Sequence, residues 1–324
     1  MLTTKTPVAL FTYNRPSHTR RAIEALSKCS RIDECDFYFF SDGPRTEGIR
    51  PQVDSTRNVL KDWAERFNAQ VIERDNNFGL AKSIVSGVTE LCERYGRVIV
   101  LEDDLVVGAD FLHYMLESLG RYEKEEQVLQ IGAFTVSSPE NLSTDVFLLP
   151  VTTTWGWATW QRAWRHFSWL PDDLNSAKSD TEWCRLFDLN GTCTFSNMLE
   201  DRLAGSNDSW GILWWYAVSR RRGLVVYPRN SLIWNGGFDG SGVHCGSGEF
   251  AGQNTPAGLA NMSSLGALIF PSKIIYEASH LTQLEDYFRV QPSNRLWRKI
   301  IRGIHRKLTS LVANVKGKVH NAIH

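Results

Sequence analysis

The 324-residue sequence predicts an α/β protein: a mostly parallel, Rossmann-like sheet with helices on both faces, followed by a C-terminal amphipathic helical tail. Three observations carry this prediction. Apolar, β-rich runs alternate with amphipathic stretches over the first 135 residues, the runs are short and almost continuously apolar, and each is followed by polar residues. Near-continuous apolar strands are typical of parallel sheets that helices bury on both faces.

Four runs are the predicted strands, and three stretches between them are the predicted helices. The strands are VALFTY (8–13), DFYFFSD (36–42), QVIER (70–74) and RVIVLEDD (97–104). The amphipathic stretches, each long enough for a helix, are 17–28, 51–67 and 78–94. A regular strand–helix alternation of this kind favours parallel neighbours joined by crossover helices.

The rhythm changes at about residue 136. The segment VSSPENLSTD (136–145) has the composition of a turn, and the chain after it is rich in Trp, Gly and short strand-like runs. We expect this second part to extend the same domain and to close over the strand ends. The predicted organisation is an N-terminal half (1–135), a second half of the same domain (136–288) and a tail (289–324).

The tail differs from the rest of the chain in charge. From Arg289 onward there are nine Lys/Arg and no Asp or Glu, which leaves a net charge of −9 on the preceding residues. Apolar residues from Trp297 to Val319 recur at helical spacing, with most basic residues off that stripe. We expect residues 290–324 to lie on an anionic membrane surface. The alternative is a terminal helix that packs its stripe on the protein's own core.

Several protein classes are disfavoured by the remaining composition. The N-terminal apolar run is short and is broken at Asn14, so it does not resemble a signal peptide, and no segment reaches the roughly twenty apolar residues of a spanning helix. The six cysteines are scattered without CxxC spacing, which favours reduced thiols. We therefore expect a cytoplasmic protein, peripheral on the inner face of a bacterial cell membrane. Nucleic acid is not among the expected partners.

Polar residues follow all four predicted strands. Because ligands in such sheets sit beyond the carboxyl ends of the strands, these residues predict one site. They are Asn14 and Arg15 after the first strand, Asp42 and Gly43 after the second, Asp75, Asn76 and Asn77 after the third, and Glu102, Asp103 and Asp104 after the fourth.

The acidic triplet carries the strongest chemical signal. Side-by-side carboxylates at a strand end are the oxygen ligands that Mg²⁺ or Mn²⁺ prefers, and such a cation neutralises a departing diphosphate. Strand alternation predicts that Glu102 and Asp104 share one side while Asp103 faces the other. The alternative is an acidic strand end with caps for the next helix, Asp110 among them.

The motifs FTYNRP, FSDGP and LEDDLVVGADFLHYM, in this order, resemble the nucleotide-sugar-dependent glycosyltransferases of the GT-A fold. Within them the chain is most similar to the N-acetylglucosaminyltransferase I type and to bacterial family 2-like transferases of surface polysaccharide assembly. The similarity covers roughly residues 5–250 in the order of motifs, and only the acidic segment is closely similar. It implies that 1–135 binds the nucleotide sugar and 136–288 binds the acceptor and carries the catalytic base.

The resemblance also implies individual roles. Asp104 is the direct metal ligand, Glu102 and Asp103 contact the donor sugar and the ribose, Asp42 holds a uracil ring and Arg15 contacts the nucleotide. The segment NNFGLAKSIVSGV (76–88) resembles the helix start that lines the nucleotide pocket. This implies that Asn77, Gly79 and Lys82 line that pocket. The implied donor is a UDP-sugar, with UDP-N-acetylglucosamine favoured by analogy, and the implied cofactor is Mn²⁺ or Mg²⁺.

A catalytic base is expected downstream, because inversion in one displacement needs a carboxylate to deprotonate the acceptor hydroxyl. SNDSWGILWWYAV (206–218) offers Asp208 before a Trp-rich helix, as in inverting relatives. The alternative is that Asp208 caps that helix, and Glu200 and Asp201 are substitute bases. His244, in a Gly-rich loop, is a candidate ligand of the metal or the diphosphate; the alternative is an exposed loop histidine.

TTTWGWATWQRAW (152–164) concentrates four tryptophans. We expect Trp160 and Trp164 in the core. Trp155 and Trp157 flank Gly156 in a predicted turn, and the resemblance places a comparable segment beside the donor sugar. Both are therefore predicted to face the sugar.

The resulting hypothesis is a metal-dependent, inverting glycosyltransferase that moves a hexosyl or N-acetylhexosaminyl unit to a glycan acceptor in surface polysaccharide synthesis. A lipid-linked acceptor is a further hypothesis from the tail. FTYNRPSHT has no glycine, which argues against a sugar nucleotidylyltransferase or a dehydrogenase with GxGxxG. A retaining transferase, and a non-catalytic carbohydrate-binding protein on the membrane, remain alternatives. The latter leaves the acidic strand ends unexplained.

Overall fold

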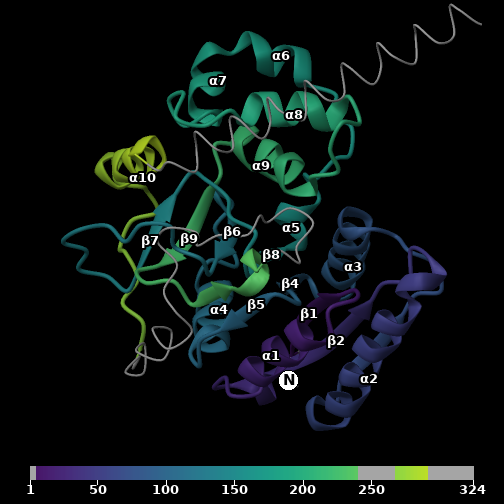
Figure 1. Cartoon of the computed structure of the whole chain (residues 1–324). Helices are drawn as coiled ribbons and strands as arrows, with labels where there is room; N and C mark the ends of the chain where they lie inside the picture. The colour runs from purple at the N-terminus through teal and green to yellow at the C-terminus, as the bar shows by residue number, and fades with distance from the viewer. Residues whose placement is uncertain (1–4, 240–266, 291–324) are drawn as a thin grey trace, which may run out of the picture.

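An eight-stranded sheet in the order β3-β2-β1-β4-β8-β6-β9-β7 forms the centre of the protein (Figure 1). The computed structural model describes residues 5–239 and 267–290. Among them, four of the seven neighbouring strand pairs are parallel. The strands are β1 (Thr6–Thr12), β2 (Cys35–Ser41), β3 (Gln70–Glu73), β4 (Arg97–Glu102), β6 (Val128–Gly132), β7 (Val146–Leu149), β8 (Trp157–Trp160) and β9 (Leu224–Pro228).

The first four strands confirm the predicted alternation. They are consecutive neighbours in the sheet and all parallel, so their carboxyl ends meet at one edge. The connecting helices match the predicted stretches within a few residues: α1 (Pro16–Leu26), α2 (Arg50–Phe67) and α3 (Leu80–Tyr95). Pro16 suits the first turn of α1, where its missing N–H costs nothing. Gly96, with φ of +75°, ends α3 in the left-handed conformation.

Helices cover both faces of the sheet, as the apolar strands predicted. One buried cluster joins α1, α2 and α4 (Phe111–Arg121) to the sheet, through residues such as Ile23, Leu60 and Phe111. A second cluster on the other face joins α3 and α9 (Trp210–Arg220), through Val88 and Trp214. The predicted fold class, a mostly parallel sheet between two layers of helices, is confirmed.

The chain after residue 136 enters the same sheet. Strand β8 lies antiparallel between β4 and β6, while β9 pairs parallel with β6 and β7 lies at the edge. The boundary that we predict at 135 and 136 stays a prediction. The remaining helices are α5 (Gln161–Trp164), α6 (Leu174–Ser179), α7 (Thr181–Phe187), α8 (Phe195–Leu203) and α10 (Ala278–Val290), with 3₁₀ turns η1 (Ile32–Glu34), η2 (Glu47–Ile49) and η3 (Gly236–Phe238).

A small second sheet extends the strand-end edge. Strand β5 (Leu105–Val107) follows the acidic triplet and pairs antiparallel with β10 (Ile233–Asn235). This pairing brings the 3₁₀ turn η3 back to the triplet. The predicted tail helix from residue 290 falls almost wholly outside the described residues. Over the described ranges, we find no helix with both the length and the apolar character needed to cross a membrane.

Candidate functional site

Side chains from several strand ends converge at the carboxyl edge of the parallel sheet. The backbone N–H of Asp42, just after β2, donates to the carbonyl of Thr12 at the end of β1, at 3.1 Å. On the other side of β1, Phe11 is in register with Glu102 at the end of β4. The residues after these strands therefore form one continuous surface.

Two carboxylates of the acidic triplet form ion pairs with an arginine of the same protein. Arg15, which immediately precedes α1, donates through Nη2 to Asp103 Oδ1 and to Asp104 Oδ2, the latter at 3.0 Å. The Tyr13 N–H donates to Asp103 Oδ2 at 3.4 Å. Asp103 is only 3% exposed, and pairing with the guanidinium offsets the cost of burying its charge. Arg15 therefore partly satisfies the demand for positive charge at this edge.

The expected alternation of side chains across the triplet is wrong. Strand β4 ends at Glu102, and Asp103 and Asp104 form a turn before β5. In a turn, successive side chains are not forced to opposite faces as they are in a strand. Both aspartates consequently reach the same guanidinium.

The carboxyl groups of this cluster outnumber its cation. Burial, and then the charges of Asp104 and Asp103, raise the pKa of Glu102 to about 8. Burial raises the pKa of Asp103 to about 6, although Arg15 opposes this shift. Burial alone would lower the pKa of Arg15, but the two aspartates outweigh it and the pKa is raised. The directions of these shifts indicate a cluster that is short of positive charge.

A glycine turn that sequence reasoning missed lies directly against Asp104. The Gly236 N–H donates to the Asp104 carbonyl at 2.8 Å, and the Gly237 N–H donates to the Asn235 side chain at 2.7 Å. A Cβ on Gly237 would lie 2.5 Å from Asp104 Oδ2, which is far inside van der Waals contact. Only glycine lets the backbone approach this carboxylate so closely. The signal available in the sequence was the pair of glycines in WNGGFDG.

Gly237→Ala is expected to weaken the binding of Mn²⁺ with UDP by about tenfold, because the new methyl displaces the Asp104 carboxylate. Calorimetric titration measures this change. Gly120→Ala is the matched control, because Gly120 lies in α4 with nothing within 4 Å of an added Cβ. That control should retain affinity and gain about 0.5–1 kcal/mol of stability. Unchanged affinity in Gly237→Ala would show that the position of Asp104 does not matter.

A histidine lies beside this turn. His18, on α1, is buried, and its Nε2 is 3.0 Å from Asp239 Oδ2 at the end of the glycine turn. No sequence pattern marks His18, because a lone histidine on a helix carries no signal by itself. His244, the predicted metal or diphosphate ligand, lies outside the described residues.

Asp42 and Asn77, predicted from two different strand ends, are brought into contact. Asp42 Oδ1 accepts from the N–H groups of Gly43 and Phe78, at 3.0 and 2.8 Å. Its Oδ2 accepts from Asn77 Nδ2 at 3.1 Å and from the Gly79 N–H at 2.9 Å. A carboxylate offers about four acceptor positions, and four donors occupy them. These four donors give Asp42 a structural role, and its expected contact with a uracil ring stays a prediction.

Asp42→Ala is expected to lower the free energy of unfolding by about 3 kcal/mol, because it removes the acceptor of four donors, three of which join the end of β2 to the start of α3. Urea denaturation measures this loss, and Asp36→Ala on the same strand serves as the comparison. If stability changes little while UDP affinity falls, Asp42 holds the base after all.

Lys82 lies close to the same loop, in the first turn of α3. Its Nζ is 4.4 Å from the centroid of the Phe78 ring, and the Arg74 guanidinium is 4.5 Å from that centroid. Phe78 is 38% exposed, which is unusual for a large apolar side chain. Its ring is flanked by two cations, which the face of an aromatic ring attracts. The arrangement offers an aromatic face and positive charge next to the Asp42 cluster.

The two tryptophans predicted to face a sugar differ in position. Trp157 is 1% exposed and packs on Trp164, Trp210 and Trp214, so its predicted role is wrong. It belongs to β8, which is central in the sheet, so both of its faces are buried. Trp160 and Trp164 are buried, as predicted.

Trp155, by contrast, is half-buried and stands in the bend before β8. Its ring centroid is 5.6 Å from that of Phe238, the residue that follows Gly237. Gly156 adopts a φ of +63° there, and a Cβ would collide with Ile233. Trp155 therefore lies next to the glycine turn, and its sugar-facing role stays a prediction.

Asp208 is exposed and precedes the N-cap of α9. The cap is Ser209, whose side chain accepts from the Ile212 N–H at 3.4 Å, so the alternative in which Asp208 caps the helix is wrong. Thr154 would contact a Cβ added to Gly211, at 3.6 Å, which places the start of α9 beside the bend that holds Trp155. Asp208, three residues before Gly211, therefore belongs to the segment that approaches this bend.

The residues at the acidic triplet supply only part of the ligand set of a divalent cation. Within the described ranges, no group of three or more His, Cys, Asp or Glu has a metal-binding arrangement. Asp103 and Asp104 offer two carboxylates, and the missing Cβ of Gly237 leaves space beside Asp104. Mg²⁺ is commonly held by one or two carboxylates, with water and substrate phosphates supplying the other ligands. This donor set therefore suits a cation that arrives together with a diphosphate.

Comparisons with known proteins give similarity in structure only, since neither a family model nor a curated protein matches the sequence. The chain is similar to solved structures that include S. aureus TarS, a mannosyltransferase and a xylosyltransferase, and the matches span 25% to 39% of the length of the TarS chains. TarS 1–349 in complex with UDP is 13% identical, with a TM-score of 0.32 over 43% of this chain and 37% of that chain.

Two further structures cover more of the chain. The mannosyltransferase PcManGT from Pyrobaculum calidifontis, in complex with GDP-Man and Mn²⁺, is 13% identical, with a TM-score of 0.38 over 66% of this chain and 69% of that one. GalNAc-T7 with UDP, GalNAc and Mn²⁺ is 10% identical, with a TM-score of 0.44 over 71% and 43%. At these identities the likeness concerns the fold alone, and the predicted N-acetylglucosaminyltransferase I type stays a prediction.

Proposed function

We propose that this protein is a metal-dependent glycosyltransferase that moves a sugar from a UDP-sugar to a saccharide acceptor with inversion at the anomeric carbon. One observation carries the proposal. Arg15, Asp103 and Asp104 meet at the carboxyl edge of four parallel strands. The backbone of the glycine turn at Gly237 packs directly against the Asp104 carboxylate. Ligands of α/β proteins bind at this edge.

The charge of the cluster supports a diphosphate bound together with a cation. Three carboxyl groups face one guanidinium, and burial makes this imbalance costly. Mn²⁺ or Mg²⁺, when bound, neutralises charge on the diphosphate leaving group. In this proposal Asp104 is the metal ligand and Asp103 helps to hold it, while Glu102, whose raised pKa favours the neutral carboxyl group, contacts the donor sugar.

The remaining groups have roles that follow from their positions. If a cation neutralised the two aspartates, Arg15 would be free to contact a diphosphate oxygen. Phe78 offers its exposed face to the nucleobase, and Lys82 beside it attracts the nucleotide. Asp208 accepts the proton of the acceptor hydroxyl as that oxygen attacks the anomeric carbon.

The finer features of the function are part of the same proposal. The transferred unit is a hexose or N-acetylhexosamine, with UDP-N-acetylglucosamine favoured by the sequence resemblance. The acceptor belongs to surface polysaccharide synthesis on the inner face of the cell membrane. Residues 290–324 supply the membrane contact in this proposal, and their basic, acid-free composition supports it.

The test is hydrolysis of a panel of nucleotide sugars by the full-length protein, with and without Mn²⁺. We expect slow release of UDP from one or two UDP-sugars, dependent on Mn²⁺ and abolished by EDTA. Release that is unaffected by EDTA would overturn the metal dependence. If no nucleotide sugar in the panel is hydrolysed or bound, the proposed activity is wrong.

A further inference from the structure

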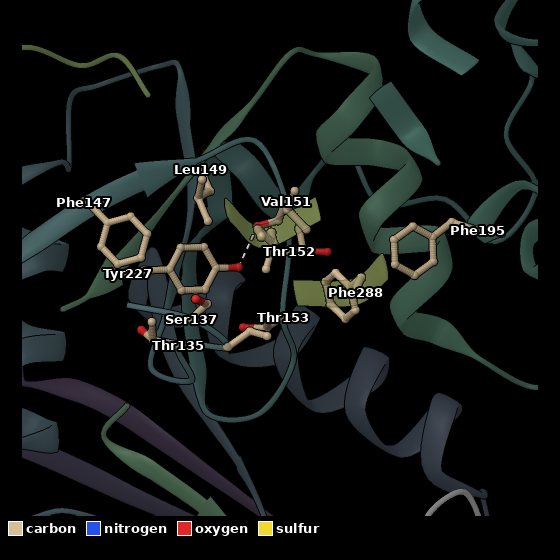
Figure 2. A pocket seen from close by; sticks show the side chains of 12 residues that line it. Thr135, Ser137, Phe147, Leu149, Val151, Thr152, Thr153, Phe195, Tyr227 and Phe288 are labelled. Carbon is tan, nitrogen blue, oxygen red and sulfur yellow. Dashed lines mark hydrogen bonds between the residues drawn. The ribbon is translucent and has the colours of Figure 1, made fainter. Parts of the chain in front are cut away.

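An apolar pocket lies against α10, and none of its lining residues belongs to the acidic cluster. Figure 2 shows the side chains that line it. Its cavity volume is about 60 Å³, below the roughly 300–1,000 Å³ of pockets that enclose a whole drug-sized ligand, so it has room for one narrow apolar group. All of its lining side chains are uncharged. They are Thr135, Val136, Ser137, Phe147, Leu149, Val151, Thr152, Thr153, Phe195, Tyr227, Leu284 and Phe288.

The floor of the pocket is apolar, although a phenol stands in it. Phe147 and Leu149 of β7 and Tyr227 of β9 are buried. The Tyr227 hydroxyl donates to the carbonyl of Val151 at 2.6 Å, so the phenol presents its ring to the pocket and not its proton (Figure 2). This floor suits hydrocarbon or an aromatic ring and gives a sugar hydroxyl little to bind.

The rim is different from the floor. Phe195 and Phe288 stand half-buried on one side in Figure 2, with Thr152 and Thr153 beside them. Together with Ser137, these threonines add hydroxyl groups to the lining. An occupant with an apolar body and a polar end therefore finds matching chemistry.

One segment joins this pocket to the candidate active site. Val151 to Thr153 line the pocket, while Thr154 lies against Gly211 at the start of α9 and Trp155 lies against Phe238. Four residues of extended chain span at most about 14 Å. An acceptor of modest length can thus occupy the pocket with one end and reach Asp208 with the other.

We propose that this pocket binds the apolar aglycone of a glycoside acceptor, an alkyl or aryl group attached to the sugar that receives the transferred unit. The inference deepens the proposed function and rests on it. The lining has no charge to recognise a phosphate or a carboxylate, and its serine and threonine hydroxyl groups offer polar partners to the attached sugar. The acceptor class is thereby an amphiphilic glycoside with its apolar end in the pocket.

The test compares matched methyl and n-octyl glycosides of glucose, galactose and N-acetylglucosamine, with the octyl compounds below their micelle concentrations. Calorimetry on the full-length protein measures their binding in the presence of Mn²⁺ and UDP. For at least one sugar, the octyl glycoside should bind about tenfold or more tightly than the methyl glycoside, because its chain is removed from water. No preference for the octyl compound would overturn the inference.

Two variants locate the binding. Val151→Phe fills the pocket but keeps the backbone carbonyl that Tyr227 uses, and Phe288→Ala removes part of the wall. Both should abolish or strongly reduce the preference for the octyl glycoside, and Phe288→Ala covers the case in which Val151→Phe fails to fold. Leu170→Ala, which removes an apolar side chain that is 78% exposed, is the control for adsorption of detergent and should change nothing.

A separate titration keeps the two proposals distinguishable. Octyl preference that survives both pocket variants would overturn the inference while leaving the proposed activity untouched. If wild-type protein fails to bind UDP with Mn²⁺, the proposed activity falls. Loss of octyl binding in the pocket variants, measured then without nucleotide, would still assign the pocket to an apolar ligand.

Discussion

Asp104→Asn is expected to reduce sugar transfer by about 10²–10³-fold and to abolish the binding of Mn²⁺ with UDP. Asparagine keeps the shape of the side chain and an oxygen that can accept from Arg15 Nη2, now 3.0 Å away. It removes the negative charge that a divalent cation requires. Steady-state kinetics and calorimetric titration of UDP with and without Mn²⁺ measure the two effects.

The matched control is Asp110→Asn, the same change six residues later in the chain. Asp110 occupies the N-cap position of α4, but its side chain accepts no capping hydrogen bond. This variant should keep both activity and UDP binding. If Asp104→Asn retains Mn²⁺-dependent binding, Arg15 and not a metal ion supplies the positive charge, and the metal part of the proposal is wrong.

The parallel half of the fold was predictable because its signal is local. Each of β1 to β4 is an apolar run that polar residues end, and the intervening helices have their own amphipathic spacing. Parallel pairing then places the strand ends at one edge without further information. That is why Arg15, Asp42 and the triplet were found together.

Side-chain contacts at that edge were not predictable, because they join distant segments. Arg15 and Asp103 are 88 residues apart, and nothing in either motif says that they pair with each other. The four donors to Asp42 come mostly from the loop after β3, whose path depends on the packing of α3. The sequence identifies polar groups at an edge but not whether they bind a ligand or one another.

The error at Trp157 has a related cause. Strand β8 lies antiparallel between β4 and β6, and no local sequence pattern predicts this position in the sheet. In a central strand both faces are buried, so alternation gives no outward position for a large aromatic side chain. Trp155 and Trp157 are alike in the sequence, and only the bend before β8 separates their environments.

The pocket between β7, β9 and α10 lies further beyond sequence reasoning. Its lining runs from Thr135 to Phe288, in several separate segments. Each segment reads as ordinary apolar or threonine-rich sequence. The concave surface exists only after β9 has paired with β6 and α10 has packed on the sheet, so no motif could have marked it.

Asp208→Asn is expected to reduce kcat by about 10²–10⁴-fold while leaving the binding of UDP and Mn²⁺ unchanged. The side chain is exposed beside the start of α9, and Ser209 performs the capping, so the helix keeps its N-cap when the carboxylate becomes an amide. What disappears is the group that takes the proton from the acceptor hydroxyl. Kinetics with a saturating UDP-sugar, beside a urea unfolding curve that should not move, measure these effects.

Asp201→Asn and Glu200→Gln are the comparison variants, because both carboxylates were substitute candidates for the base. Glu200 accepts from Lys178 at 2.8 Å on the exposed surface of α8, which gives it a partner of its own. Neither variant should lower kcat. If one of them loses activity while Asp208→Asn keeps it, the base has been assigned to the wrong carboxylate. If all three remain active while Asp104→Asn does not, transfer needs no carboxylate base at this helix, and the inverting mechanism gives way to a retaining one.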